Sequence, residues 1–485
     1  PDYAREYGAY LNKRVVLHAT EKDDKIEVFR LADGQTKVRI ERLLSDRPNE
    51  RFYQRTFMPD ETKELWIYGL GDKDVFVVSG DREADIFVRL IGGYGEDHFV
   101  IKNRKSVKVY DWKHEEIKLE GKAVKKQLTD LYTTNTFHWR YFKPNTNVFV
   151  PTAGFRTDDG LFLGAKDTYT NEGFNGNPFR QKHTLTAKYY FNFRAAELKY
   201  VGVFANIFPK WNFELDGHVT SDRYINNFFE FGNETVNNED SVGRDFYRAR
   251  VQQTKLSAGI AYHTLKFRTL FESYETEQVN DRLFTPGNFD TQVFDRQNYT
   301  GAETSLYYYN DDADDFPTKG LYVSLMGGYK QNISLMENRF GYFGANLKVV
   351  RRLIPSGDLV LATELAYRTN IGNNYFFYHA PSIGGDNGLR GFRDERFTGR
   401  SYFYQSTDLR VRLKHYVTAV TPVTIGLYGG FDYGRVWQPD ESSNVWHTSQ
   451  GIGLWVGTAN YLGLNAGVFN SVEGTFVQFG FGFGF

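Results

Sequence analysis

Residues 402–415, Tyr402-Phe-Tyr-Gln-Ser-Thr-Asp-Leu-Arg-Val-Arg-Leu-Lys-His415, alternate between two kinds of side chain and decide the fold. Successive side chains of an extended strand point to opposite faces. One face would carry Phe403, Thr407, Leu409, Val411 and Leu413, and the other would carry Asp408, Arg410, Arg412 and Lys414. A charge that faces lipid near mid-membrane costs ~2–4 kcal/mol. The charged face therefore predicts a wet or protein-filled interior, and the apolar face predicts contact with lipid.

The same period-two pattern recurs from Val148 to the end of the chain. The segments are longer than the roughly 5–6 residues of an ordinary strand, which argues against a soluble β-sandwich. An even number of strands brings both ends of a barrel to one side of the membrane. We therefore predict an all-β fold with a sixteen-stranded antiparallel transmembrane β-barrel over residues 146–485. Its strands are expected near 148–157, 160–170, 183–193, 195–207, 210–220, 246–262, 264–277, 297–309, 319–331, 337–353, 358–371, 402–415, 421–434, 447–457, 461–469 and 475–485.

The connections between these strands alternate in length over the second half of the barrel. Short turns of bacterial barrels face the periplasm and long loops face the outside. The short connections are Ile354–Gly357, Tyr416–Val420 and Thr458–Asn460, and the long ones are 221–245, 278–296, 372–401 and 435–446. The segment Asn171–Lys182 departs from this rule, because it would make a long turn on the periplasmic side.

The composition of the chain agrees with a barrel in the bacterial outer membrane. The 485 residues include 42 Phe, 33 Tyr and 7 Trp, and membrane barrels use aromatic side chains as girdles at both interfaces. The 59 basic and 60 acidic residues balance, so a nucleic-acid partner has no electrostatic support. There is no cysteine, and no run approaches the ~18 apolar residues of a membrane helix. The chain begins at Pro1 rather than Met, and we expect it to be mature or trimmed.

The first part of the chain differs from the barrel. Residues 1–112 contain short β-like runs separated by turns rich in Gly and Asp, which predicts a small β-rich domain, a sandwich or a solenoid, in the periplasm. The runs are Ile26–Leu31, Lys37–Leu43, Glu64–Tyr68, Val75–Ser79 and Ile86–Ile91. Residues 113–145 are polar and dense in Lys and Glu, and they are expected to form a linker with some helix.

Two turns of the N-terminal part resemble the glycine–aspartate turns of calcium-binding β-rolls. They are Tyr68-Gly-Leu-Gly-Asp-Lys-Asp-Val-Phe76 and Gly93-Tyr-Gly-Glu-Asp-His-Phe99. A calcium ion would need carboxylate oxygens from stacked turns, supplied here by Asp72, Asp74, Glu96 and Asp97. The alternative is a pair of solvated turns with no metal. Calcium is the only cofactor that the sequence suggests.

The stretch Ile383-Gly-Gly-Asp-Asn-Gly-Leu-Arg-Gly-Phe392 lies between two predicted strands and is too rich in glycine to be a strand itself. We interpret Leu389, Arg390, Gly391 and Phe392 as the tip of an outer loop that folds back into the barrel. Gly388 and Gly391 would permit the sharp return. A guanidinium inside the barrel needs a carboxylate on the wall, and its planar fork suits a bidentate pair.

Three motifs fall in order along the predicted barrel: Pro317-Thr-Lys-Gly320, Leu389-Arg-Gly-Phe392 and Phe431-Asp-Tyr-Gly-Arg-Val-Trp437. Together they resemble the superfamily of outer-membrane assembly factors and two-partner secretion transporters, the bacterial surface-antigen barrels with BamA and TamA among them. The resemblance covers residues ~146–485. The chain also ends Phe479-Gly-Phe-Gly-Phe-Gly-Phe485, similar to the terminal strand that the insertion machinery reads in such barrels.

The resemblance implies that Arg390 reaches into the lumen and pairs with Asp432. Asp408, on the lumen face of the preceding strand, is a second candidate partner, and Phe392 would wedge beneath the loop. The alternative is that Arg390 lies in water and that another group satisfies Asp432.

The N-terminal part departs from this superfamily, because residues 1–145 show no POTRA module. Its turns, with Thr157-Asp-Asp-Gly-Leu-Phe-Leu-Gly164, resemble a branch in which a calcineurin-like metallophosphoesterase precedes the barrel. The histidine and aspartate metal motifs of that enzyme are absent from this sequence.

The resemblance implies that the barrel inserts or translocates unfolded or exported polypeptides through a seam between its first and last strands. Pro151 belongs at a strand edge, and glycines weaken a strand. The seam residues are Pro151, Gly154, Gly480, Gly482, Gly484 and Phe485. Expected partners are outer-membrane lipid, polypeptide clients, and accessory periplasmic or lipoprotein subunits.

Two alternatives stay open at this point. The barrel could anchor or export a periplasmic metallophosphoesterase-type domain, or it could be a passive porin. Catalysis by the barrel itself has little support, since the ten histidines are scattered and no Ser-His-Asp or paired-carboxylate set can be assembled from the sequence.

Overall fold

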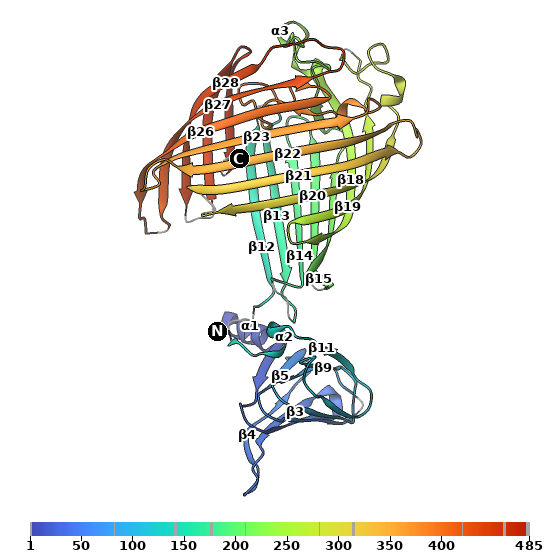
Figure 1. The fold of residues 1–485 in the computed structure, drawn as a ribbon, viewed down its shortest axis with the longest axis vertical. Helices are drawn as coiled ribbons and strands as arrows, with labels where there is room; N and C mark the ends of the chain where they lie inside the picture. The colour runs from blue at the N-terminus through green and yellow to red at the C-terminus, as the bar shows by residue number, and fades with distance from the viewer. Residues whose placement is uncertain are drawn as a thin grey trace. The chain divides into compact units, whose positions relative to one another are not determined.

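The computed structural model describes residues 2–81, 83–139, 143–156, 158–174, 178–208, 210–280, 282–312, 316–419, 421–458 and 462–481. The chain forms two compact units (Figure 1), which are described separately. One unit is residues 1–144 together with 172–178, and the other is 145–171 together with 179–485. Within the described ranges, every helix is too short or too polar to cross a membrane.

The N-terminal unit is a two-sheet β-solenoid. The first sheet is parallel throughout and the second is parallel except where β3 and β4 are added at one side. The first sheet holds β1 (Arg14–His18), β5 (Glu64–Leu70), β7 (Phe87–Gly93), β9 (Val107–Asp111) and β11 (Lys125–Leu128). The second holds β10 (Lys118–Gly121), β8 (His98–Ile101), β6 (Val75–Gly80), β2 (Asp24–Arg30), β3 (Thr36–Arg42) and β4 (Glu50–Phe57). Two helices, α1 (Asp2–Asn12) and α2 (Tyr132–Asn135), belong to the same unit.

Stacked rungs of this solenoid bury alternate apolar residues between the two sheets. Ile67 lies beside Leu90 in one sheet and Phe76 beside Phe99 in the other, and all four are fully buried. The rings of Phe76 and Phe99 stack with centroids 4.6 Å apart. Period-two burial in parallel strands explains why the sequence showed short alternating runs there, and it selects the solenoid over the sandwich.

The segment 113–145 was predicted as a linker, and this was wrong. It supplies β10, which pairs with β8, and β11, which pairs with β9. Both strands are polar because they lie at sheet edges with exposed side chains. Backbone pairing, which leaves no hydrophobic pattern, places them in the solenoid.

Aspartates at the start of successive rungs form a buried ladder. The backbone N–H of Asp24 donates to Oδ1 of Asp74 at 2.9 Å, and the backbone N–H of Asp74 donates to Oδ1 of Asp97 at 3.0 Å. A side chain at Gly69 would collide with the Asp74 carboxyl, and one at Gly92 would collide with that of Asp97. The two similar turns of the sequence therefore have the same structure on neighbouring rungs.

Burial raises the pKa of the ladder carboxyls, although the backbone N–H groups act in the opposite direction. The pKa of Asp74 rises to about 9 and that of Asp97 to about 8. In the unfolded chain an aspartate has a pKa of about 3.9. Between these values the folded unit holds protons that the unfolded chain has released, so stability falls as the pH rises from about 4 towards 9.

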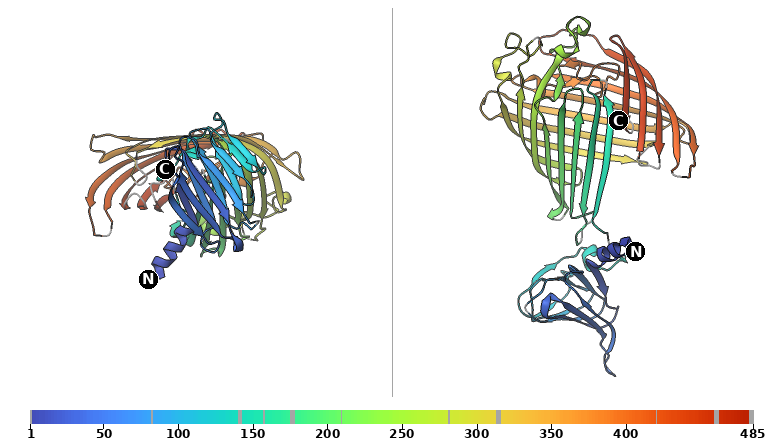
Figure 2. Two further views of the ribbon diagram at one scale, coloured as in Figure 1. Left: turned by 90° about the horizontal axis from the view of Figure 1, so that it is seen from below. Right: turned by 180° about the vertical axis from the view of Figure 1, so that it is seen from behind.

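The second unit is an antiparallel β-barrel wall (Figures 1 and 2). Its sheet has 17 strands in sequence order, of which β17 (Ile225–Asn227) is a short extension, leaving the sixteen that were predicted. They are β12 (Thr146–Arg156), β13 (Gly160–Asn171), β14 (Gln181–Tyr190), β15 (Ala195–Phe208), β16 (Trp211–Thr220), β18 (Arg248–Tyr262), β19 (Leu265–Thr276), β20 (Gln297–Asp311), β21 (Lys319–Asn332), β22 (Arg339–Arg352), β23 (Leu359–Ile371), β26 (Ser401–Tyr416), β27 (Val423–Trp437), β28 (His447–Thr458), β29 (Leu462–Ser471) and β30 (Gly474–Phe481).

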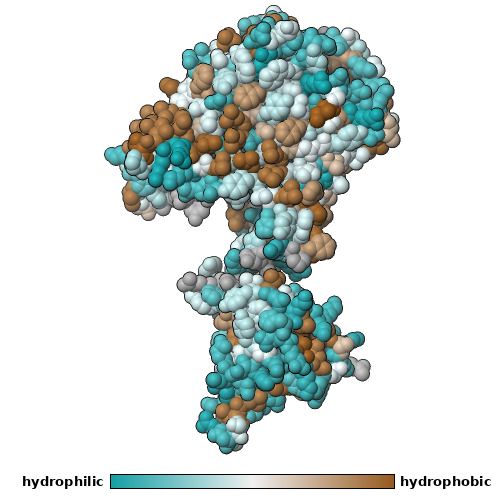
Figure 3. Space-filling model, viewed as in Figure 1, coloured by the Kyte–Doolittle hydropathy of each residue, from teal (hydrophilic) through white to brown (hydrophobic). Residues whose placement is uncertain are grey.

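The two faces of the wall are those that the alternation predicted. Leu409 is 43% exposed and Leu413 57%, whereas Asp408 and Arg410 between them are buried at 2% and 0%. Hydrophobic side chains gather over the outer face of the wall strands in the space-filling view (Figure 3). The apolar face thus points outward, and the charged face lines the interior of the barrel.

We predict that the Asp74→Asn variant flattens the pH dependence of the N-terminal unit, because asparagine keeps the acceptor oxygen but binds no proton. The measurement is the urea concentration at which the unit becomes sensitive to protease in the full-length protein in detergent. The urea midpoint of the wild type should decrease as the pH is raised from 5.5 to 8.5. The urea midpoint of the variant should change less over the same range.

The control for this experiment is Asp72→Asn, because Asp72 lies in the same turn and is exposed. It should keep the wild-type slope. An unchanged slope in Asp74→Asn would show that the ladder does not hold protons.

Candidate functional site

The connection between β23 and β26 enters the barrel and turns back within it. Residues 384–392 form its tip, held by bonds from the Gly384 N–H to the Asn387 carbonyl at 3.0 Å and from the Gly385 N–H to the Leu389 carbonyl at 2.9 Å. Gly388 has φ +95° and lies so close to the ring of Tyr404 that any side chain there would collide with it. Glycine at this position therefore lets the tip approach the wall.

Arg390 meets both of the wall carboxylates proposed for it. Its Nη2 lies 2.6 Å from Oδ1 of Asp432 and its Nε 3.1 Å from Oδ2, which makes a bidentate pair. Its Nη1 lies 2.7 Å from Oδ1 of Asp408, and its backbone N–H also donates to Asp432 at 3.1 Å. The interpretation in which Arg390 stays in water is therefore excluded by the geometry.

The surroundings of Arg390 fix the pair in place. Ser406 and Ser449 both donate to the carboxylate of Asp432, the latter at 2.8 Å. The guanidinium lies over the ring of Phe469 at 4.1 Å from its centroid. A Cβ at Gly430 would lie 2.7 Å from Nη2 of Arg390, so this wall position has no room for a side chain. These hydrogen bonds orient the carboxylate towards the guanidinium, which favours a single docked geometry.

Asp408 also pairs with a second arginine. Arg410, two residues along β26 and fully buried, donates to Oδ2 of Asp408 at 3.2 Å. The lumen site thus contains two carboxylates and two guanidiniums, and its charge balances. A balanced set is what allows four ionised groups to share a buried space.

The apolar residues of the tip pack beneath the ion pairs. Leu389 and Phe392 are buried at 0% and 1%, and the ring of Phe392 meets that of Phe397 with centroids 5.3 Å apart. Gly391 lies against the wall, where a Cβ would be 2.6 Å from Cβ of Ser449. We name the whole arrangement of Leu389, Arg390, Gly391, Phe392, Asp408 and Asp432 the loop lock.

The residues that follow the lock reach the two ends of the sheet. Arg393 pairs with Asp158 at 3.0 Å, in the turn between β12 and β13, and it lies over the ring of Phe476 of β30 at 5.2 Å. Arg396 pairs with Glu473 at 2.6 Å, in the turn between β29 and β30. We name Arg393, Arg396, Asp158 and Glu473 the clasp, because together they join the first hairpin to the last.

The pKa values of Glu473 and Glu239, the carboxyls that pair with Arg396 and Arg393, are set by opposing effects. Burial raises the pKa of the Glu473 carboxyl, while the nearby Arg396 acts to lower it. Burial also acts to raise the pKa of Glu239, which accepts from Nε of Arg393 at 3.1 Å, but hydrogen bonds from Arg393 and Asn237 outweigh it and lower that pKa. Arg393 is thus shared between two carboxylates, Asp158 and Glu239.

The described parts of the first and last strands lie side by side without pairing through backbone hydrogen bonds. Over Thr146–Arg156 and Gly474–Phe481, the described parts of β12 and β30, the strand pairings are those with β13 and β29 alone. Figure 2 shows the first strand, in cyan, beside the last strands, in red, and side chains of both line a cleft of about 620 Å³. Phe155 and Val477 lie in this cleft, together with Arg393 and Glu473 of the clasp.

The proposed seam residues fall on both sides of this opening. Pro151 lies in β12 opposite Ala165 of β13. Gly154 and Gly480 line a second cavity of about 450 Å³, which also contains Arg390 and Asp408. The cavity therefore joins the seam to the lock. Gly482, Gly484 and Phe485 lie outside the described residues.

The predicted calcium ligands are not gathered into one site. Asp74 and Asp97 accept backbone N–H groups in the ladder, and Glu96 pairs with Lys73 at 2.6 Å. Asp72 is exposed. Throughout the described ranges, no group of three or more His, Asp or Glu side chains is placed to hold a metal ion. The Oδ2 atoms of Asp74 and Asp97 have no hydrogen-bond partner among the described residues, and calcium binding stays a prediction.

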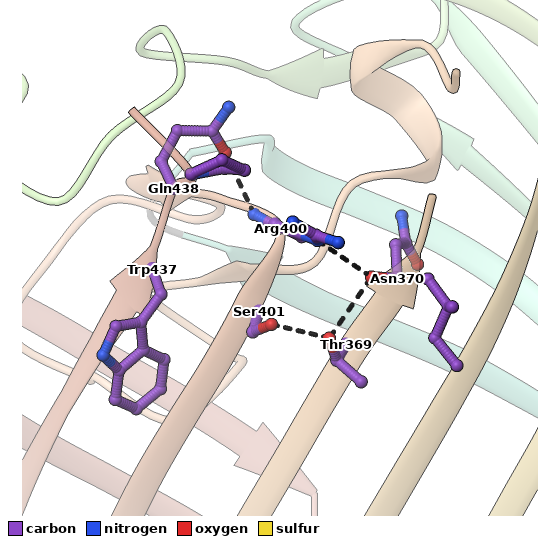
Figure 4. A pocket seen from close by; sticks show the side chains of 8 residues that line it. Thr369, Asn370, Arg400, Ser401, Trp437 and Gln438 are labelled. Atoms are coloured by element: carbon purple, nitrogen blue, oxygen red, sulfur yellow. Dashed lines mark hydrogen bonds between the residues drawn. The ribbon is translucent and has the colours of Figure 1, made fainter. Parts of the chain in front are cut away.

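A pocket of about 370 Å³ lies at the outer ends of β23, β26 and β27 (Figure 4). The backbone N–H of Arg400 donates to Oε1 of Gln438 at 3.1 Å, and its Nε donates to the Asn370 carbonyl at 3.4 Å. Thr369 and Ser401 share a hydroxyl hydrogen bond of 2.6 Å. These bonds attach the end of the inward loop to the wall where β26 begins.

The clasp was not found from the sequence. Arg393-Asp-Glu-Arg396 follows the lock motif directly, and four charged residues beside a loop tip were a usable signal. Their partners could not be chosen in advance, because Asp158 and Glu473 are 235 and 77 residues away along the chain.

Comparison with known proteins gives one family and several solved structures. Residues 326–456 match the family "Haemolysin secretion/activation protein ShlB/FhaC/HecB". No curated protein matches the chain. Among solved structures it is similar to BamA from Haemophilus ducreyi lacking POTRA domains 1–3, with 14% identity over 70% of this chain and 69% of that one and a TM-score of 0.49.

Two further solved structures are CdiB proteins. CdiB from Escherichia coli is 10% identical over 68% of this chain and 61% of that one, with a TM-score of 0.45. CdiB from Acinetobacter baumannii is 13% identical over 70% of this chain and 59% of that one, with a TM-score of 0.43.

The family match and the geometry point to the same part of the chain. The matched residues 326–456 include the inward loop and both carboxylates that hold Arg390. The family model therefore covers the part of the barrel wall that contains the loop lock.

Proposed function

We propose that this barrel moves polypeptides into or across the outer membrane through the seam between β12 and β30. The observation that carries the proposal is that the described parts of these two strands lack a shared ladder and are joined by side chains of the docked loop. A junction made of a few ion pairs can open without breaking a sheet.

The free edge of β12 supports a role in strand addition. Val148, Phe149 and Val150 are exposed at 52%, 66% and 45%, so both faces of this edge are apolar and accessible. An unpaired apolar edge is a template for another strand. An extended client segment would gain main-chain hydrogen bonds along β12 and burial for alternate side chains.

The docked loop argues against a passive pore. It fills the lumen with a buried, charge-balanced cluster, and the cavity that remains beside Arg390 measures about 450 Å³. In the proposed function, the docked loop lies on the transport route, and its release from the wall is controlled.

We propose that the N-terminal unit lies in the periplasm. Within the described residues, β12 begins at the barrel end that carries the short connections, such as that between β18 and β19 at residues 263–264. Short turns face the periplasm in outer-membrane barrels. The solenoid and its open edge strands β10 and β11 are then on the side from which clients and accessory subunits arrive.

We expect Arg390→Ala to release the loop and enlarge the channel. The change leaves Asp432 buried without its bidentate partner, and breaking a buried pair costs roughly 3–5 kcal/mol. Single-channel conductance in planar bilayers should rise, and the loop should become accessible to protease. Arg390→Lys should give an intermediate result, because lysine lacks the planar fork.

Arg351→Ala is the matched control for this variant, since Arg351 is an exposed arginine at the periplasmic end of β22. It should behave as wild type. Wild-type conductance in Arg390→Ala would show that the lock does not restrict the lumen.

We expect the double variant Arg393→Ala/Arg396→Ala to open the outer end of the seam. Spin labels at Phe155→Cys and Val477→Cys, in a chain with no native cysteine, would report the distance across the cleft. The distance distribution should shift to longer values and broaden when the clasp is removed.

Arg244→Ala is the control that separates bridging from simple charge loss. Arg244 also pairs with Asp158, at 2.8 Å, but it comes from the loop between β17 and β18 and not from the inward loop. If both variants widened the seam equally, the clasp would have no bridging role.

A photo-crosslinker at Phe149 should trap polypeptides in growing cells. The same group at Phe343, a lipid-facing position of β22 that is 40% exposed, is the control. Protein adducts specific to Phe149, identified by mass spectrometry, support transport through the seam. Lipid adducts alone at both positions would refute it.

A further inference from the structure

Five arginines line one pocket at the outer end of the barrel, between β14 and β18. The pocket has a volume of about 390 Å³. Its lining residues are Asn192, Phe193, Arg194, Arg223, Ile225, Asp245, Arg248, Arg250 and Arg282. Of the described residues that line it, Asp245 is the only acid, so five positive charges less one negative charge leave a net +4.

Neighbouring acids neutralise this charge only in part. Asp245 lies 2.8 Å from Nη1 of Arg248 and 3.7 Å from Nη2 of Arg282, so one carboxylate serves two guanidiniums. Arg250 pairs outside the pocket lining with Glu277 at 2.9 Å. Within the described structure, Arg194 and Arg223 form no ion pair with a carboxylate, and both are exposed.

Two of the arginines are held rigidly at the base of the pocket. Arg248 donates from Nη2 to the Asp158 carbonyl at 2.6 Å, and its guanidinium lies over the ring of Phe193 at 4.9 Å. Arg282 donates from Nη1 to the Arg248 carbonyl at 3.1 Å. Burial lowers the pKa of Arg282, and repulsion from Arg250 and Arg248 adds to this effect while Asp245 opposes it. The like charges are thus close enough to repel one another.

An anion would relieve this repulsion. A guanidinium presents a planar fork of donors that matches the oxygens of a phosphate group. Charge-assisted hydrogen bonds of this kind are shorter and about twice as strong as neutral ones. The volume of the pocket exceeds that of one phosphate group and leaves space for the sugar or glycerol that carries it.

The pocket adjoins the lipid-facing surface. The turn after β14 begins with Phe191, which is 46% exposed, and Tyr189 before it is 41% exposed with its ring 5.3 Å from that of Phe191. Leu161 at the start of β13 is 50% exposed, and its carbonyl accepts from the Phe191 N–H at 3.2 Å. Apolar side chains therefore continue from the membrane belt to the rim beside the arginines.

We propose that this pocket binds the phosphate group of a lipid headgroup in the outer leaflet, with the acyl chains lying on Leu161, Tyr189 and Phe191. The phosphate is the chemistry that the arginines recognise, and a free phosphate ion shares it. The apolar rim favours the lipid source. This binding is independent of polypeptide transport and stands even if the seam does not open.

The test is native mass spectrometry of the full-length protein in detergent with three probes. These are a lipid A bearing two phosphates, the same lipid after enzymatic removal of its phosphates, and inorganic phosphate. The phosphorylated lipid should be retained, its dephosphorylated form should bind at least about tenfold more weakly, and inorganic phosphate should compete only at far higher concentration.

The variant Arg194→Gln/Arg223→Gln removes two exposed arginines whose loss leaves the barrel contacts intact. Retention of the phosphorylated lipid should fall about tenfold, whereas Arg339→Gln, an exposed arginine at the outer end of β22, should leave it unchanged. Equal binding of both lipids, unchanged retention in the double variant, or full competition by inorganic phosphate at the lipid's own concentration would each overturn the proposal.

Discussion

The structure depends on the need of one buried guanidinium for opposite charge. Arg390 is carried into the barrel by a loop, and there it meets Asp432 and Asp408 at hydrogen-bonding distance. An arginine cannot lose its proton in such surroundings, so the wall must supply carboxylates and the loop must bring the arginine to them. The glycine at 430 and the serines at 406 and 449 follow from this requirement, since they leave room for the guanidinium and orient its partner.

The same loop explains how an incompletely paired sheet stays together. Neighbouring strands inside the wall share long ladders, such as that between β26 and β27 from Ser401 to Tyr416. Across the described seam the connection is made by side chains, chiefly those of Arg393 and Arg396. Each hydrogen bond to a charged group contributes about 1.5–3 kcal/mol. Over the described residues, the seam is therefore the junction of the wall that side chains, rather than a backbone ladder, hold together.

Side-chain alternation was enough to predict the barrel, because in a membrane wall each residue faces either lipid or lumen. The alternation of Leu409 and Leu413 with Asp408 and Arg410 is typical, and it located the strands to within a few residues. The loop lock could be predicted from the sequence, because its loop residues are adjacent along the chain and its aspartates lie on predicted strands.

No sequence pattern marks the features that depend on backbone pairing, on burial, or on contacts between residues far apart in the chain. The strands β10 and β11 are joined through their backbones, so their polar side chains suggested a linker. Asp74 and Asp97 have the residue type and spacing of calcium ligands, and one oxygen of each accepts a backbone N–H from a neighbouring rung, so calcium binding there stays a prediction. The clasp needs residues from both ends of the barrel, and only the folded sheet brings these together.

The position of the lock along the chain has a consequence for assembly. Besides Asp408, the described groups that contact Arg390 itself include Asp432 of β27, Phe469 of β29 and Gln478 of β30, which donates to the Arg390 carbonyl at 3.1 Å. The tip precedes these strands during synthesis, so it can settle only after the last four strands, β27 to β30, have joined the wall. A seated tip therefore marks a finished cylinder, and a truncated or stalled chain would leave it loose.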